Sequence, residues 1–371
     1  MEDLRIIISG GGTGGHIFPA VSIANAIKQL EPDAKILFVG AEGRMEMTRV
    51  PAAGYEIKGL SVRGLIRPLY SLKNIGVMRD FFKSKRIVKG IIKDFAPHAV
   101  VGVGGYASSP TLNAAHALGI PCLIQEQNSF AGVTNKSLGK KAAKICVAYE
   151  GMERFFPKER IVLTGNPVRQ NLLHVEESKA ECAAAFGMNL DKPIILLVGG
   201  SLGARTLNES VLNNLQQIAD APVQFIWQTG SYYKKHIEEE LKAKGKPANL
   251  YVTDFVSRMD QAYKAADLVI SRAGASSISE LCLLGKPSIL VPSPNVAEDH
   301  QTHNAMALVN KQAALYVKDA EAQEELIPLA LQTVGNESLL EELGRHAHEM
   351  AYPDSAEVIA EMVLKLARDN S

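Results

Sequence analysis

The chain has 371 residues, of which 46% are hydrophobic and 22% charged, and its 40 Lys and Arg residues balance its 40 Asp and Glu residues. This composition is typical of a globular protein long enough for two domains, and the balanced charge disfavours a dedicated nucleic-acid binder. The cysteines lack metal-binding or redox spacing, which predicts reduced core thiols at Cys122, Cys146, Cys182 and Cys282. No signal peptide or membrane span is visible, so we expect the protein to stay on the cytoplasmic side of the membrane.

Short apolar strands alternate with helical stretches along the chain. The first strand, 4–9, runs into the glycine-rich turn Gly10–His16, and strand 193–198 runs into a second one, Gly199–Ala204. The other expected strands are 34–39, 99–103, 121–125, 144–148, 160–164, 223–227, 250–253, 267–271 and 288–292. This alternation predicts an α/β protein with parallel sheets covered by helices on both faces.

The repeated cadence predicts two doubly wound, Rossmann-like domains, residues 1–165 and 166–352, with the link beginning at Gly165-Asn166-Pro167. If the domains face one another, the carboxyl ends of their strands, and with them both glycine turns, border a central cleft. We therefore expect the ligand to bind there. Glycines in such turns let backbone N–H groups approach an anion, and the helix that follows adds a partial positive charge.

The first turn also fits a dinucleotide-binding fingerprint. Gly10, Gly12 and Gly15 have the required spacing, and Glu42 at the end of the second strand could hold a ribose hydroxyl, which would make the chain an oxidoreductase. Two features count against this interpretation. His16 stands where a small residue lets the helix approach the pyrophosphate, and the second half of the chain carries a nucleotide turn of its own.

That second half contains a more specific pattern, Arg272–Glu280, directly after strand 267–271. Ser276, Ser277 and Glu280 share one face of the predicted helix. A carboxylate accepts two hydrogen bonds at once, which suits the vicinal hydroxyls of a ribose, and the helix N-terminus suits a diphosphate. The alternative is that the serines only cap a helix and that Glu280 is solvated.

Taken together, these residues resemble the GT-B glycosyltransferases and, more closely, the MurG family, whose members transfer N-acetylglucosamine to lipid I to form lipid II in bacterial peptidoglycan synthesis. The resemblance extends from Arg5 to the C-terminal helix. Its motifs are Gly11–Ala20, Gly104-Gly105-Tyr106, Gln125-Glu126-Gln127-Asn128, Thr134-Asn135-Lys136, Gly165–Arg169, Gly199-Gly200-Ser201, Arg272-Ala273-Gly274 with Glu280, and His300-Gln301 with Asn304-Ala305.

The resemblance implies a GT-B fold in which the C-terminal helix, 356–371, completes the first domain and the second domain binds UDP-N-acetylglucosamine. Glu280 would bind the ribose, Gln301 the donor sugar, and the backbone of Phe255 and Val256 the uracil. The region around His300 departs most from the family pattern, so Thr302 competes with Gln301. The remaining donor-binding residues that the resemblance implies are Thr13, Gly14, Gly15, Asn128, Arg169, Ser201, Ala275, Ser276 and Ser277.

The implied reaction is a single inverting displacement, which needs a base for the acceptor hydroxyl and stabilisation of the departing UDP. His16 is the candidate base, with an unperturbed pKa of ~6.5, unless it only hydrogen-bonds a phosphate. Glu126 is the reserve candidate, unless it only orders its loop. No paired carboxylates stand beside a nucleotide turn, so no tightly bound metal or other cofactor is expected.

A polyprenyl-linked acceptor requires a membrane-facing surface. Residues 62–93 contain nine Lys and Arg residues and a single acid, Asp80. Basic residues interleaved with apolar ones suit the anionic phospholipid of the inner membrane, so we expect peripheral attachment. The helical stretch 81–92 could instead be core with a solvated basic face. The loop residues Leu65, Ile66, Arg67, Leu69 and Tyr70 are the better membrane candidates, and Gly104, Gly105 and Tyr106 could hold the lipid diphosphate.

Two other functions remain open at this point. Another GT-B enzyme that uses a UDP-sugar, such as a glycolipid synthase or a UDP-N-acetylglucosamine epimerase, would keep the nucleotide turns, but an epimerase would not need a basic and apolar loop. A non-enzymatic sugar-nucleotide or scaffold protein would be expected to have lost one of the turns. The resemblance also implies a role in cell shape and cell division, with other cell-wall synthesis proteins as partners. No motif in the sequence identifies such a partner.

Overall fold

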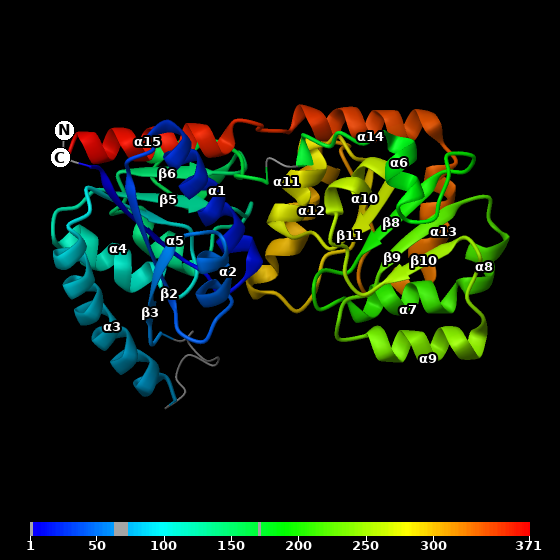
Figure 1. Ribbon diagram of the computed structural model, residues 1–371, viewed down its shortest axis with the longest axis horizontal. Helices are drawn as coiled ribbons and strands as arrows, with labels where there is room; N and C mark the ends of the chain where they lie inside the picture. Colours follow the sequence, from blue (N-terminus) through cyan, green and yellow to red (C-terminus); the bar gives the residue numbers. More distant parts are fainter. Residues whose placement is uncertain (1–2, 63–72, 170–171) are drawn as a thin grey trace. The chain divides into compact units, whose positions relative to one another are not determined.

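The computed structural model describes residues 3–62, 73–169 and 172–371 (Figure 1). The chain forms two compact units. Unit 1 comprises Met1–Val168 and Tyr352–Ser371, and unit 2 comprises Arg169–Ala351. Each unit is built around one parallel sheet.

The sheet of unit 1 has seven strands in the order β3-β2-β1-β4-β5-β6-β7, all parallel. Its strands are β1 (Arg5–Ser9), β2 (Lys35–Ala41), β3 (Glu56–Leu60), β4 (Ala99–Gly102), β5 (Cys122–Glu126), β6 (Lys144–Val147) and β7 (Ile161–Leu163). Its helices are α1 (Gly14–Leu30), α2 (Glu46–Ala52), α3 (Lys73–Phe95), α4 (Ser108–Ala117), α5 (Val133–Gly139) and α15 (Ser355–Arg368), with short 3-10 turns η1 (Met152–Arg154) and η2 (Lys158–Arg160).

Helices cover both faces of this sheet because β1 is apolar on both sides. Ile6 and Ile8 point into a core that they share with α1 and α15, where Ile23 and Ile359 are fully buried. Ile7 points into the opposite core, which is completed by α3 and α4. In Figure 1 the C-terminal helix α15, drawn in red, runs along the sheet beside α1. The last helix of the chain thus packs on the first sheet.

Two segments of unit 1 cross closely where the chain leaves the unit and returns to it. A Cβ atom on Gly165 would lie 2.3 Å from Cβ of Tyr352, and the φ of Gly165 is +72°. Only glycine combines that backbone conformation with such a close approach. The Gly-Asn-Pro motif therefore has a structural role at this crossing.

The sheet of unit 2 has six parallel strands in the order β10-β9-β8-β11-β12-β13. Its strands are β8 (Ile194–Val198), β9 (Gln224–Gln228), β10 (Leu250–Thr253), β11 (Leu268–Ser271), β12 (Ser288–Leu290) and β13 (Leu315–Tyr316). Its helices are α6 (Lys179–Ala184), α7 (Arg205–Asn213), α8 (Leu215–Asp220), α9 (Lys234–Lys244), α10 (Met259–Ala265), α11 (Ala275–Leu283), α12 (His300–Val309), α13 (Ala322–Val334) and α14 (Glu337–Glu349), with the 3-10 turn η4 (Ala297–Asp299).

One face of this sheet packs on α7, α9 and α13, with Trp227 at the centre of the core. The indole N–H of Trp227 donates to Oδ1 of Asn208 at 3.0 Å, so the buried polar group is satisfied. The two strand orders place β1 beside β4 and β8 beside β11, and these are the positions where the order of the strands reverses. Ligands of doubly wound sheets bind at the carboxyl ends of such strands.

The two-sheet α/β architecture predicted from the sequence is confirmed, and the differences lie at the edges. Strands β3 and β13 were not predicted. β3 is an edge strand in which Glu56, Lys58 and Gly59 interrupt the apolar pattern, and β13 has only two residues. Helix α3 is longer than the predicted 81–92 and begins at Lys73, although its first turn contains Asn74 and Gly76, which are poor helix formers. All four cysteines are buried and unpaired.

Candidate functional site

His16 lies in the first turn of α1, directly after the glycine turn that leaves β1. Its Nδ1 is 3.1 Å from the hydroxyl of Thr13, and its backbone N–H donates to the carbonyl of Thr13 at 3.1 Å. A Cβ atom on Gly104 would lie 2.8 Å from His16 Nε2, so the ring lies against the turn that follows β4. The structure therefore brings together His16, Thr13 and Gly104, three residues singled out in the sequence. Gly14 and Gly15 are the first residues of the same helix.

Glu46 was missed in the sequence analysis and lies beneath the same glycine turn. Its side chain is 1% exposed; Oε2 accepts the backbone N–H of Gly12 at 2.8 Å, and Oε1 accepts that of Ala41 at 3.0 Å. The backbone N–H of Gly12, which the glycine turn was expected to present to a phosphate, is therefore already bonded to a carboxylate. Glu42, the residue proposed to hold a ribose in a dinucleotide site, instead accepts a hydrogen bond from Ser61. The available signal was an acidic residue in the first turn of a helix that follows a parallel strand.

Gly104 and Gly105 form a turn that packs on the glycine turn of β1. Their φ angles are +94° and +85°, and a Cβ on Gly105 would lie 2.3 Å from the carbonyl oxygen of Gly11. The hydroxyl of Ser108, the first residue of α4, donates to the carbonyls of Ser9 and Gly104. Tyr106 is 46% exposed. These contacts leave its ring at the surface beside a rigid pair of turns.

Glu126 ends β5 and is 1% exposed. Its Oε1 accepts the backbone N–H of Asn128 at 3.0 Å and the side-chain amide of Asn128 at 3.3 Å. Its Oε2 accepts the backbone N–H of Gly132 and the side-chain amide of Asn135, each at 3.0 Å. Four donors therefore surround one carboxylate. This arrangement orders the 126–135 loop and also orients Asn128, an expected donor-binding residue.

In unit 2 the loop after β8 carries Ser201, which is exposed. This loop is tied to its neighbour through Gln228, whose amide Nε2 donates to the carbonyls of Gly200 and Asp254, both at 2.9 Å. Gln228 is 3% exposed. The loop that carries Ser201 and the loop that carries Phe255 are therefore joined by one buried side chain, a residue that sequence reasoning missed.

The segment after β10 holds the two residues expected at the uracil. Phe255 is 61% exposed and Val256 is buried. The backbone oxygen of Phe255 accepts the Thr253 hydroxyl at 2.9 Å, and its N–H donates to the same hydroxyl at 3.4 Å. The exposed ring of Phe255 thus stands on a fixed turn, with its own backbone groups already engaged.

Helix α11 begins at Ala275, directly after Gly274, and its N-terminal N–H groups are among the four that a helix leaves without an intrahelical partner. The hydroxyl of Ser276 is buried and has no hydrogen-bond partner. Ser277 is partly buried beside it. Unpaired N–H groups and an unpaired buried hydroxyl at one helix end fit an anion such as a diphosphate.

Glu280 lies one turn further along α11 and is 7% exposed. Its Oε1 accepts Nε and Nη2 of Arg169 at 3.0 and 2.8 Å, and its Oε2 accepts the hydroxyl of Tyr263 at 3.1 Å. Burial raises the pKa of the Glu280 carboxyl, and Arg169 and Tyr263 oppose that rise by stabilising the charged form. Burial and the facing carboxylate raise the pKa of Tyr263, so its hydroxyl stays protonated as a donor.

Gln301 lies in the first turn of α12, and its Oε1 accepts the backbone N–H of Ser293 at 2.9 Å. The competing residue, Thr302, donates its hydroxyl to Asp299 at 2.8 Å. Both side chains are partly buried. Gln301 therefore retains an amide NH₂ group that can serve a ligand.

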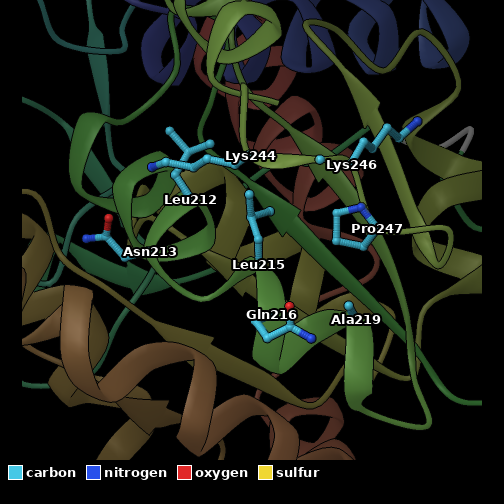
Figure 2. Close-up of a pocket in the computed structure, with 9 residues that line it drawn as sticks. Leu212, Asn213, Leu215, Gln216, Ala219, Lys244, Lys246 and Pro247 are labelled. Atoms are coloured by element: carbon cyan, nitrogen blue, oxygen red, sulfur yellow. The ribbon is translucent and has the colours of Figure 1, made fainter. Parts of the chain in front are cut away.

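The structure also bears on a metal site, on hollows in the surface and on the expected membrane residues. Within residues 3–62, 73–169 and 172–371, no group of three or more His, Cys, Asp or Glu side chains is arranged to hold a metal ion. An open hollow on unit 2, at the amino ends of the strands, is lined by Leu212, Leu215, Gln216, Lys244 and Pro247 among others, and by none of the expected donor-binding residues (Figure 2). The expected membrane residues Leu65, Ile66, Arg67, Leu69 and Tyr70 lie outside the described residues.

Comparison with known proteins identifies the family. Residues 6–147 match the glycosyltransferase family 28 N-terminal domain, and residues 194–359 match the C-terminal domain of the same family. The UDP-N-acetylglucosamine–N-acetylmuramyl-(pentapeptide) pyrophosphoryl-undecaprenol N-acetylglucosamine transferase of Bacteroides fragilis is 61% identical over 370 residues, which cover 100% of this chain and 97% of the relative. The chain belongs to the MurG family of glycosyltransferases.

Solved structures agree with membership of the MurG family. The crystal structure of Acinetobacter baumannii MurG has a TM-score of 0.79 at 30% identity and covers 98% of this chain and 99% of its own. The UDP-N-acetylglucosamine 2-epimerase of Neisseria meningitidis has a TM-score of 0.66 at 15% identity, covering 98% and 100%, which shows a shared fold alone. The GT-B fold expected from the sequence is thereby confirmed. The alternative of another GT-B enzyme that uses a UDP-sugar, either a glycolipid synthase or an epimerase, is not favoured.

Proposed function

We propose that this chain transfers N-acetylglucosamine from UDP-N-acetylglucosamine to lipid I, the undecaprenyl-diphosphate-linked N-acetylmuramyl-pentapeptide, to give lipid II in peptidoglycan synthesis. The observation that carries this assignment is identity of 61% along the whole chain to a transferase named for that reaction. The buried carboxylate of Glu280, the open N-terminus of α11 and the histidine at the first glycine turn supply the chemistry that the reaction needs.

Unit 2 binds the donor in this proposal. Glu280 accepts the ribose hydroxyls, the N-terminus of α11 with Ala275, Ser276 and Ser277 binds the diphosphate, and Phe255 and Val256 border the uracil. Arg169 and Ser201 add a cation and a hydroxyl near the diphosphate, and Gln301 offers its amide to the sugar. The unpaired hydroxyl of Ser276 supports this arrangement, because a buried polar group without a partner is costly unless a ligand satisfies it.

His16 acts as the general base. The 4-hydroxyl of the muramyl sugar attacks the anomeric carbon, its proton passes to Nε2 of His16, and the bond from that carbon to the diphosphate breaks with UDP taking the electron pair. Thr13 supports this role, since its hydroxyl, 3.1 Å from Nδ1, can accept a hydrogen bond from a protonated Nδ1 and so favours the tautomer in which Nε2 is the basic nitrogen. Positive charge from Arg169 and the helix N-terminus of α11 stabilises the leaving UDP.

Glu126, the reserve candidate for the base, acts instead as a positioning residue. Its oxygens already accept four hydrogen bonds from the loop that it closes. A carboxylate has about four acceptor positions, so none remains for the proton of a substrate. The same bonds fix the position of Asn128, which we expect to contact the donor.

The acceptor binds on unit 1, where Gly104, Gly105 and Tyr106 lie beside His16, and Thr13, Gly14 and Gly15 complete the surroundings.

No helix in the described part of the chain is long and apolar enough to cross a membrane. We assign peripheral binding to the exposed face of α3. Val88 and Ile92 are buried in the core, while Phe82 and Ile87 are 62% and 41% exposed among the exposed basic residues Arg79, Lys83, Arg86, Lys89 and Lys93.

The activity is tested by incubating purified protein with labelled UDP-N-acetylglucosamine and a lipid I analogue. We expect label in the lipid and equimolar UDP, and a loss of at least about 100-fold in kcat for His16→Ala, the usual size of a general-base contribution. His116→Ala, an exposed histidine at the end of α4 in the same unit, is the matched control. UDP release without labelled lipid would contradict lipid I as acceptor.

Membrane binding is tested by flotation with vesicles of phosphatidylcholine alone or with one-third phosphatidylglycerol. We expect binding only to the anionic vesicles, and a loss of binding on Arg86→Glu with Lys89→Glu, because each basic residue near such a surface contributes about 1 kcal/mol. Lys235→Glu with Lys242→Glu makes the same change in charge on α9 of unit 2 and should leave binding intact. Equal loss in both double variants would contradict a specific role of α3.

A further inference from the structure

We propose that Tyr263 is a positioning residue that sets the preference of the donor site for a ribonucleotide, and that Arg169 occupies the place of the ribose until the nucleotide arrives. The inference rests on the proposed function, in which Glu280 binds the ribose of UDP. It concerns how the carboxylate is held before and after binding.

Tyr263 is built to hold the carboxylate in one orientation. The residue is 4% exposed on α10, a helix separate from the one that carries Glu280, and its hydroxyl donates to Oε2 at 3.1 Å. A buried aromatic ring has few rotamers, so this donor stays at a fixed position in the core. The hydroxyl therefore fixes the rotation of the carboxylate about its final bond.

Arg169 occupies the other oxygen in a different way. Its side chain is 37% exposed, compared with 9% for that of Glu280, and two of its nitrogens donate to Oε1 at 3.0 and 2.8 Å. A partly exposed arginine side chain changes rotamer more readily than a tyrosine ring buried in the core. Of the two partners of Glu280, Arg169 is the one that can leave.

Counting acceptor positions shows why one partner must leave. Each carboxylate oxygen accepts about two hydrogen bonds. Oε1 already accepts two from Arg169, and Oε2 accepts one from Tyr263, so only one position remains for the two hydroxyls of a ribose. Departure of Arg169 frees both positions on Oε1, while Tyr263 continues to hold Oε2.

When the ligand is a nucleoside diphosphate, the guanidinium of Arg169 that leaves Glu280 has a new anionic partner. Arg169 exchanges one anion for another, pairing with the diphosphate after it leaves the carboxylate. Uridine supplies hydroxyls to Glu280 but no anion to Arg169, so its binding must break an ion pair without replacing it. The exchange thus couples recognition of the ribose to the presence of the diphosphate.

The test compares dissociation constants of UDP, 2′-deoxy-UDP and uridine by isothermal titration calorimetry at pH 8. The wild-type protein should prefer UDP over 2′-deoxy-UDP by about tenfold or more, the value of one hydrogen bond to a charged group. Tyr263→Phe should reduce that preference to about threefold or less. The ratio is measured on one protein preparation, so a smaller folded fraction does not change it.

Tyr251→Phe is the matched control for the tyrosine. Its ring lies on β10 of the same unit and packs edge-on against Phe186 with centroids 5.4 Å apart. This variant should keep the wild-type ratio. An unchanged ratio in Tyr263→Phe, or an equal change in Tyr251→Phe, would overturn the assigned role of Tyr263.

Arg169→Ala tests the exchange, because it should change the affinities for UDP and for uridine in opposite directions. UDP should bind about tenfold or more weakly, because the cation that neutralises the diphosphate is gone, whereas uridine should bind more tightly, because the place of the ribose is open. Uridine binding that is unchanged or weaker would overturn the exchange. If Glu280→Ala binds UDP as tightly as the wild type, the ribose site itself is wrong. If the UDP to 2′-deoxy-UDP preference is as expected but no transfer to lipid I occurs, only the acceptor assignment is wrong.

Discussion

The carboxylate of Glu46 accepts the backbone N–H of Gly12 at 2.8 Å and so fixes the glycine turn that carries His16. The same side chain accepts the N–H of Ala41 at the end of β2. A Cβ on Gly11 would lie 2.3 Å from the carboxyl carbon, so the turn is wrapped closely around this group. Glu46 therefore holds together three segments on which the position of His16 depends.

Replacing Glu46 by Gln should destabilise unit 1 and reduce transfer. One end of the amide becomes a donor that faces a backbone N–H, which leaves a buried group unpaired at a cost of about 1–3 kcal/mol. Chemical denaturation should show the loss, and kcat should fall more than the affinity for UDP, since unit 2 is unaltered. Glu56→Gln on β3 is the control, because that side chain is 64% exposed. Wild-type stability in Glu46→Gln would contradict this role.

Substituting Gly105 by Ala should be far more damaging than the same change at Gly54. The two glycines have φ of +85° and +88°, so both variants bear a similar backbone strain of about 1–2 kcal/mol. A Cβ on Gly105 would in addition meet the carbonyl of Gly11 at 2.3 Å, whereas nothing lies within 4 Å of a Cβ on Gly54. The difference between their unfolding free energies measures the close approach of the two turns. Equal losses would show that the turns separate easily.

Glu126→Gln should lower transfer without changing the shape of its pH dependence. The amide keeps only one acceptor oxygen, so the backbone N–H of either Asn128 or Gly132 loses its acceptor and the loop is less ordered. If His16 is the base, the acid limb of the kcat profile persists in this variant and disappears in His16→Ala. Loss of the limb in Glu126→Gln alone would reverse the two roles.

Lys286 should make unit 2 more stable as the pH rises. Burial, assisted by the nearby charge of Lys179, lowers the pKa of Lys286 to about 8 from 10.5. Between these values the unfolded chain binds a proton that the folded chain does not, so stability increases with pH across that window. From pH 7 to 9.5, wild type should gain on the order of 1–2 kcal/mol relative to Lys286→Met.

The control for this lysine is Lys242→Met, at an exposed position on α9 of the same unit. It should keep the pH dependence of the wild type in urea denaturation. A Lys286→Met variant with the same slope as wild type would show that the lysine retains its ordinary pKa in the folded protein.

Local sequence by itself determined the elements whose apolar residues are continuous and whose ends carry glycine. The strands 4–9 and 193–198 and the turns that follow them were predictable, because fully buried parallel strands are apolar on both sides and only glycine permits the turns. The fold and family followed from the order of these motifs. β3 was missed because an edge strand does not need a continuous apolar run.

The tertiary structure alone decided how the polar side chains are paired. Gln228 and Tyr263 carry no local signal of their roles, because their hydrogen-bond partners lie between 17 and 28 residues away along the chain. Glu46 has a local signal in its place in the first turn of α2, but its bond to Gly12, 34 residues away, does not follow from it. Likewise, the place of Glu280 on α11 allowed us to predict a carboxylate that binds a ribose. Its ion pair with Arg169, 111 residues away, could not be predicted. Helical and strand periodicity reports which face of an element is buried, whereas hydrogen-bond partners depend on which elements the fold brings side by side.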